Sequence, residues 1–124
     1  MIDKIIEPYS LRARGDMATV GVRLPWYRAL PLSTVEIDEV QIDGEVIERE
    51  RLSIQLMGEL WPVSAMRSIT DHNWFVTDTA DLRIEQLALA PGSHHEVQVM
   101  ISLYPPYIKG FRRAFRWQLS MEVR

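Results

Sequence analysis

The stretch from Phe115 to Val123 reads Phe-Arg-Trp-Gln-Leu-Ser-Met-Glu-Val, with apolar and polar residues in strict alternation. Successive side chains of a β-strand point to opposite faces, so a period of two separates the apolar from the polar residues. The pattern therefore predicts a half-buried strand with its odd-numbered residues turned toward a core. That inner face carries Phe115, Trp117, Leu119, Met121 and Val123.

The same alternation recurs elsewhere in the chain. It runs through 94–103 and more briefly through 20–24 and 52–56. Asp43-Gly44 is a strong hairpin signal, because a tight turn of this kind needs positive φ. Ala90-Pro91-Gly92 predicts a second turn before the strand at 94–103. Only the segment 62–68 suggests helix, as a single turn that begins at a proline.

In two places the apolar residues change parity, which predicts β-bulges near Asp38-Glu39 and between Ile84 and Leu87. Seven or eight short strands at near-regular spacing are typical of an all-β protein: an antiparallel β-sandwich, immunoglobulin-like in general style. Besides Phe115, Trp117 and Leu119, the residues expected to be buried are Val20, Val22, Val97, Val99 and Ile101.

Length and composition limit the class of protein. The chain has 124 residues and a net charge of -3, so we expect a single domain over 1–124 and no nucleic-acid partner. With no cysteine it has neither disulfides nor a thiolate site. Its first residues hold no apolar leader, and no apolar run is long enough to cross a bilayer. The expectation is a cytoplasmic protein without a membrane partner.

The histidines and acids do not form a recognisable catalytic or metal site. His94 and His95 are neighbours in a strand and should point to opposite faces, while His72 lies in a polar turn. A zinc or manganese site needs three or four convergent ligands. No nucleophile elbow, Ser-His-Asp arrangement or phosphate loop is evident. We expect no catalytic residue and no bound metal in this chain.

Two aromatic and basic segments remain as candidate sites. The segment 22–33, VRLPWYRALPLS, places Trp, Tyr, Arg and Leu on a proline-stiffened loop. It can be a partner surface or a cover over the end of the sandwich, and both interpretations stay open. The segment 104–117, YPPYIKGFRRAFRW, predicts a hairpin with its aromatic turn free for a protein contact. A further alternative is nucleic-acid binding through Arg112, Arg113 and Arg116.

Five stretches resemble the small β subunit of bacterial C-glycoside deglycosidases, enzymes that cleave carbon–carbon bonds. The most specific stretch is 22–33, and the similarity extends from about Thr19 to about Tyr107. The other four stretches are VQIDGE at 40–45, TDHNWF at 70–75, APGSHHEV at 90–97 and YPPY at 104–107. Ala29 stands where glycine is expected in many relatives, which implies that this position does not need positive φ.

The resemblance implies a β-sandwich subunit that works only with a larger α subunit, in a higher-order heteromer. The α subunit would have the barrel fold of sugar-phosphate isomerases and would hold a divalent metal, manganese, together with the catalytic groups. The complex would act on 3-oxo-C-glycosides of flavonoid type by β-elimination. We expect this chain to contact the α subunit, or to form a wall of its pocket, through the two aromatic segments. The residues concerned are Pro25, Trp26, Tyr27, Arg28, Pro31, Leu32, Tyr104 and Tyr107. The alternative is a free-standing module that binds carbohydrate or protein, with Trp26 and Tyr27 as a stacking platform.

Overall fold

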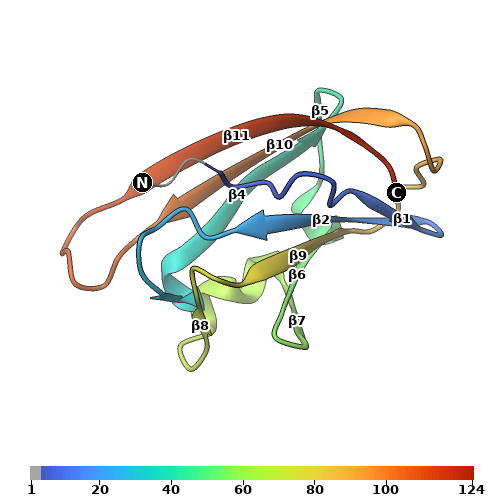
Figure 1. The fold of residues 1–124 in the computed structure, drawn as a ribbon. Helices are drawn as coiled ribbons and strands as arrows, with labels where there is room; N and C mark the ends of the chain where they lie inside the picture. The colour runs from blue at the N-terminus through green and yellow to red at the C-terminus, as the bar shows by residue number, and fades with distance from the viewer. Residues whose placement is uncertain (1–3) are drawn as a thin grey trace.

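The computed structural model describes residues 4–124 and shows two antiparallel β-sheets packed face to face (Figure 1). The first sheet has the order β1-β2-β9-β6-β7 and the second β11-β10-β4-β5, with a small third sheet, β3-β8. This arrangement confirms the all-β sandwich that the alternation predicts. The strands are β1 (Arg12–Arg14), β2 (Met17–Arg23), β3 (Leu30–Pro31), β4 (Val35–Ile42), β5 (Glu45–Val46), β6 (Leu52–Leu56), β7 (Glu59–Pro62), β8 (Asn73–Trp74), β9 (Thr79–Ile84), β10 (His94–Leu103) and β11 (Arg113–Glu122).

Residues 4–124 contain three helical segments, all short 3-10 turns: η1 (Leu32–Thr34), η2 (Arg49–Arg51) and η3 (Val63–Ser68). The last begins after Pro62, as the proline at 62 predicts. Within the described residues, no helix has both the length and the hydropathy needed to cross a bilayer.

The core lies between the inner faces of the two large sheets. Val20 and Val22 of β2 and Val97, Val99 and Ile101 of β10 are fully buried, as predicted. Trp74 is among the largest fully buried side chains, and its indole nitrogen donates to the Asp78 carbonyl at 3.0 Å. Because the indole N–H has a partner, the ring is buried without an unsatisfied donor.

The bulge predicted near Asp38-Glu39 is confirmed. Met100 pairs with Glu39 and Ile101 pairs with Ile37, so Asp38 is the extra residue in β4. The slip lets Val35 and Ile37 before it and Val40 and Ile42 after it all face the core. The Asp43-Gly44 turn is also present, with positive φ at both residues.

The second predicted bulge is wrong. β9 ends at Ile84, and the chain turns at Glu85 and Gln86, the latter with φ of 57°. Leu87 and Leu89 follow the turn in irregular backbone and pack against the edge of the core. A change of apolar parity has two physical origins, a bulge or the end of a strand, and here it marks the end.

The predicted burial of β11 is correct in direction and wrong in degree. Its side chains alternate as expected, but Phe115, Trp117 and Leu119 are only half-buried. β11 is an edge strand, and Arg124, two residues beyond its end, is hydrogen-bonded to Leu11 and Ala13 at β1, which has only three residues. Most of β11 therefore extends past the short strand that faces it.

Candidate functional site

The two aromatic segments singled out in the sequence meet at one end of the sandwich. The first is the loop between β2 and β3, and the second is the turn between β10 and β11 (Figure 1). We call Trp26, Tyr27, Arg28, Tyr107 and Phe111 the aromatic cluster. The two segments that form it are about 80 residues apart along the chain and come together because the two sheets pack face to face.

Tyr107 is the centre of the aromatic cluster. Its hydroxyl oxygen accepts a hydrogen bond from the Trp26 indole nitrogen at 2.5 Å. The Tyr27 hydroxyl oxygen lies 3.4 Å from it, and the Arg28 guanidinium carbon lies 5.0 Å from the centre of its ring. Arg28 thus adds a cation–π contact to the two hydrogen bonds.

The aromatic rings pack at an angle to one another. The ring centroids of Trp26 and Tyr27 are 5.1 Å apart with an interplanar angle of 39°, and Phe111 lies 6.3 Å from Trp26. Tilted contacts of this kind are favourable for aromatic rings. The three rings therefore do not form one flat surface.

Burial divides the loop at 25–33 into a covered part and an exposed part. Trp26 is only 9% exposed, whereas Tyr27 is 65% exposed and Arg28 is also exposed. Pro25 and Leu32 are buried and Pro31 half-buried, so these three help to close the end of the sandwich. The cover interpretation is therefore confirmed for these three residues, whereas Tyr27, Arg28 and Tyr107 face the solvent and stay the predicted partner surface.

The two phenols of this surface differ in acidity. The hydrogen bond with Tyr107 raises the pKa of Tyr27. Partial burial opposes ionisation of Tyr107, but its hydrogen bonds with Tyr27 and Trp26, and the Arg28 charge, lower its pKa. Tyr107 is therefore the more acidic phenol of the pair.

Tyr104, the other tyrosine of this segment, belongs to a different group of contacts. The Arg67 guanidinium carbon lies 4.0 Å from the centre of its ring, and its hydroxyl accepts from Arg112 at 3.0 Å and donates to Glu36 at 3.2 Å. Arg112 also approaches Asp38 at 3.8 Å. Arg112, one of the cations considered for nucleic-acid binding, thus lies beside two carboxylates.

His72 lies between two carboxylates. Its Nδ1 is 3.0 Å from Asp71 and its Nε2 is 2.6 Å from Glu59, and the hydrogen bond with Asp71 is the main reason that its pKa is raised. Both ring nitrogens are therefore engaged by acids on opposite sides of the ring, which does not suit a metal ligand. Among the residues described, no group of three or more His, Cys, Asp and Glu is arranged to hold a metal ion.

A Ser-His-Asp arrangement is present that the sequence analysis missed. His95 Nε2 lies 2.8 Å from the Ser93 hydroxyl and its Nδ1 lies 2.6 Å from Asp43. The hydrogen bond with His95 lowers the pKa of Asp43. Only the pairing of β4 with β10 could have revealed this arrangement, because it brings the Asp43 turn beside His95.

The hydrogen bonds among Ser93, His95 and Asp43 connect two turns, and we call these three residues the latch. The Ser93 hydroxyl donates to the Ala90 carbonyl at 2.5 Å, and the Ser93 and Gly92 backbone N–H groups donate to Ala90 and Val123. Those two N–H groups are therefore not free to stabilise an oxyanion beside the serine. The contacts tie the turn at 90–93 to the Asp43 turn.

The fold and the aromatic cluster define a class: a β-sandwich protein that presents a tyrosine- and arginine-bearing surface on paired loops at one end. Sequence comparison then places the chain within that class. The family model for the C-glycoside deglycosidase beta subunit matches residues 8–107. The chain belongs to this family.

Individual relatives agree with the family match. A C-glycoside deglycosidase beta subunit from Microbacterium trichothecenolyticum is 42% identical over 86% of this chain and 80% of its own length. A 3'-dehydrocarminate deglycosidase beta subunit from a Microbacterium species is 41% identical over the same shares. A C-glycoside deglycosidase beta subunit from Arthrobacter globiformis is 33% identical over 86% of this chain and 81% of its length.

Proposed function

We propose that this chain is the small β subunit of a heteromeric C-glycoside deglycosidase. Its exposed cluster residues Tyr27, Arg28 and Tyr107 would dock on an α subunit of sugar-phosphate-isomerase-like barrel fold, near the mouth of its active site. The family match supports the subunit role. The observation that carries the docking site is the meeting of two loops, distant in sequence, around Tyr107.

The proposed reaction is the β-elimination of an aglycone from a 3-oxo-C-glycoside. A base of the α subunit removes the proton on sugar C2, which the C3 ketone acidifies. The electron pair forms the C1–C2 double bond as the bond from C1 to the aglycone breaks, and the aglycone carbon takes up a proton. No oxidant or reductant is consumed, and the products are a free aglycone and an unsaturated keto sugar.

The catalytic base and the divalent metal, manganese, are assigned to the α subunit. In this chain His72 and His95 are each engaged on both ring nitrogens, and neither lies among three convergent ligands. The donor sets among the described residues therefore do not fit the metal.

The geometry of the exposed surface favours protein docking over sugar stacking. A carbohydrate platform needs open aromatic faces, but Trp26 is almost buried and tilted against Tyr27. Tyrosine and arginine are enriched among the residues that dominate protein–protein binding energy. A free-standing carbohydrate-binding module is therefore the weaker proposal.

Co-expression tests the proposal. The chain is produced with a sugar-isomerase-like barrel encoded beside it, purified through a tag on this chain only, and assayed on a 3-oxo-C-glycoside. We expect the barrel protein to co-purify, and we expect aglycone release only when both chains are present. Aglycone release by either chain alone, or failure of the two chains to associate, would contradict the proposal.

A further inference from the structure

We propose that the end of the sandwich that holds the aromatic cluster also carries a basic patch, which docks against an acidic surface of the α subunit and steers the two subunits together. The basic patch consists of four exposed arginines: Arg28, Arg67, Arg112 and Arg113. The inference rests on the proposed function, because it names the chemistry of the partner surface that meets the aromatic cluster.

Two arginines of the basic patch lie over aromatic rings from the two loops that meet at this end. The Arg28 guanidinium carbon lies 5.0 Å from the centre of the Tyr107 ring, and that of Arg113 lies 5.1 Å from the centre of the Phe115 ring. Contact with a ring face orients a guanidinium group and leaves the N–H donors at its edge available. Both arginines can therefore receive an acceptor from outside the chain.

The other two arginines share the ring of Tyr104. The Arg67 guanidinium carbon lies 4.0 Å from the centre of that ring, and the Arg112 guanidinium carbon lies 5.9 Å from it. The acids of this group, Glu36 and Asp38, are half-buried, whereas both arginines are exposed. The side chains that face the solvent here are therefore positively charged.

The basic patch has few carboxylate partners of its own. Within residues 4–124, no ion pair joins Arg28, Arg67 or Arg113 to an acid. The segment 104–117 contains four cations and no acid. Arginine binds carboxylates in a charge-assisted and often bidentate arrangement. An acidic partner surface would supply the carboxylates that this end of the chain lacks.

The opposite end of the same sheet is acidic. The stretch 43–50 holds four acids and one arginine, and the Asp43 N–H donates to the Glu96 carbonyl near the start of β10. Leu103, at the end of β10, pairs with Arg113 (Figure 1). A ten-residue strand such as β10 spans roughly 33 Å. This charge separation would turn the basic patch toward an acidic surface during approach.

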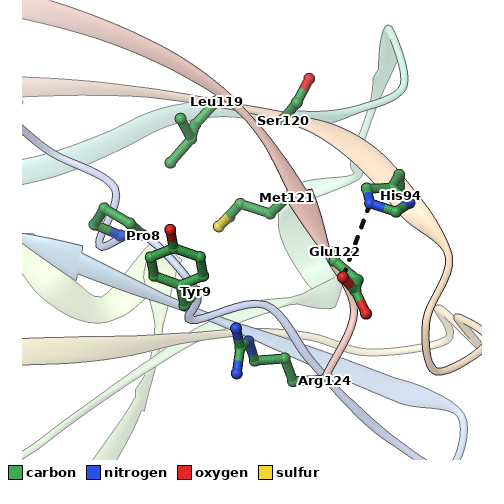
Figure 2. Close-up of a pocket in the computed structure, with 8 residues that line it drawn as sticks. All are labelled: Pro8, Tyr9, His94, Leu119, Ser120, Met121, Glu122 and Arg124. Atoms are coloured by element: carbon green, nitrogen blue, oxygen red, sulfur yellow. Dashed lines mark ion pairs between the residues drawn. The ribbon is translucent and has the colours of Figure 1, made fainter.

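The far end of β11 lacks this excess of positive charge. Figure 2 shows the hollow there, where Arg124, His94 and Glu122 all contribute to the lining. Arg124 also lies over an aromatic ring, 5.0 Å from the centre of Tyr9, but His94 Nε2 is 3.9 Å from the Glu122 carboxylate. Because an acid already accompanies these cations, the hollow is the weaker site for an acidic partner.

A protein surface fits the basic patch better than a nucleic acid does. Single-stranded nucleic acids stack their bases on open aromatic faces. Here an arginine lies over a face of each ring concerned: Tyr104, Tyr107 and Phe115. The chain also has a net charge of -3, which disfavours a polyanion.

The salt dependence of association tests the inference. The association rate constant of the 124-residue chain with the barrel-type α subunit is measured by stopped flow at ionic strengths of about 0.01 M and about 0.15 M, where the Debye length is roughly 30 Å and roughly 8 Å. We expect the parent to associate about tenfold faster at the lower ionic strength. Arg67→Gln/Arg113→Gln, which leaves the aromatic cluster intact, should differ by less than about threefold between the two conditions.

Arg12→Gln/Arg14→Gln is the matched control, because it removes the same number of charges from exposed positions in β1. It should keep most of the parent's salt dependence, and circular dichroism melting shows that each variant is folded. Equal rates for the parent at both ionic strengths, or equal losses in the two double variants, would overturn the acidic partner and leave the subunit role intact.

Two further outcomes are distinguished by the same proteins. If the parent does not associate with the barrel-type subunit at either ionic strength, the proposed function is contradicted and this inference fails with it. Single-stranded DNA is the second probe, and we expect no binding at an ionic strength of about 0.15 M. DNA binding that Arg67→Gln/Arg113→Gln abolishes would assign the basic patch to nucleic acid and overturn the inference.

Discussion

Tyr107 joins the two loops of the aromatic cluster through a single oxygen atom. That oxygen accepts the Trp26 indole N–H at 2.5 Å and also contacts the Tyr27 hydroxyl. Trp26 is 9% exposed, so water reaches its N–H poorly when the acceptor is lost. The Tyr107 hydroxyl therefore contributes to stability as well as to the exposed surface.

Tyr107→Phe should lower the free energy of unfolding by about 1 kcal/mol, because it leaves a largely buried donor without its partner. Tyr27→Phe is the matched control: it removes an exposed hydroxyl and should change that free energy by less than about 0.5 kcal/mol. Urea unfolding measures both. Equal effects of the two changes would show that the Trp26–Tyr107 hydrogen bond does not hold the loops together.

His72 should make stability depend on pH. The hydrogen bond with Asp71 and the charge of Glu59 raise its pKa above the ordinary 6.5, so the protonated ring stabilises the folded chain. This contribution to the free energy of unfolding is complete at pH values below the pKa that His72 has in the unfolded chain. It is lost as the pH rises through the higher pKa that His72 has in the folded chain. The free energy of unfolding is measured against pH for the parent and for His72→Asn.

The advantage of the parent over His72→Asn should be greatest near pH 6 and should shrink as the pH rises above the ordinary pKa of 6.5. Glu59→Gln should lose part of the parent's pH dependence of the free energy of unfolding. Glu50→Gln, at an exposed glutamate in η2, should keep all of it. Parallel curves for the parent and His72→Asn would contradict the account.

At the scale of the element, the N-terminal segment lies antiparallel beside β2 at Gly21. The Glu7 N–H donates to the Gly21 carbonyl at 2.9 Å, and the Gly21 N–H donates to the Ser10 hydroxyl at 2.9 Å. A Cβ added at Gly21 would lie 3.0 Å from the Thr79 methyl group and 3.1 Å from the Ser10 Cβ. Glycine is required here by close approach and not by its φ.

Gly21→Ala should therefore lower the free energy of unfolding by about 1–3 kcal/mol through overpacking. Thr79→Ser removes the nearest methyl group and keeps the hydroxyl, so it should recover part of the loss in the Gly21→Ala background. Thermal melting of the single and double variants measures the coupling. Full parental stability of Gly21→Ala would show that the N-terminal segment beside β2 moves aside at no cost.

Apolar periodicity predicted the strands well and their surroundings less well. It located β2, β6, β10 and β11 and the bulge at Asp38, because side-chain parity is a property of a single strand. It could not show that β9 ends at Ile84 or that β11 overhangs β1. Both depend on which strands lie opposite each other, which the sequence does not display.

At the scale of the whole molecule, the candidate site is formed by packing between distant segments. Residue types marked both aromatic loops, but only the fold shows that Trp26 and Tyr107 meet, that Pro25 and Leu32 are buried, and that Tyr104 lies in another group. The Ser93–His95–Asp43 latch was missed for the same reason, because strand pairing brings its members together.

The affinity of the chain for the barrel-type α subunit tests the central claim most directly. Isothermal titration calorimetry compares the parent, Tyr27→Ala/Arg28→Ala, and Tyr9→Ala/Arg12→Ala, a control pair that is also exposed but lies outside the aromatic cluster. The account predicts that the first variant binds at least about tenfold more weakly, since losing one interface anchor often costs about 2 kcal/mol. The control should bind within about twofold of the parent. Equal affinity of all three proteins would contradict the account and place the α subunit on another surface.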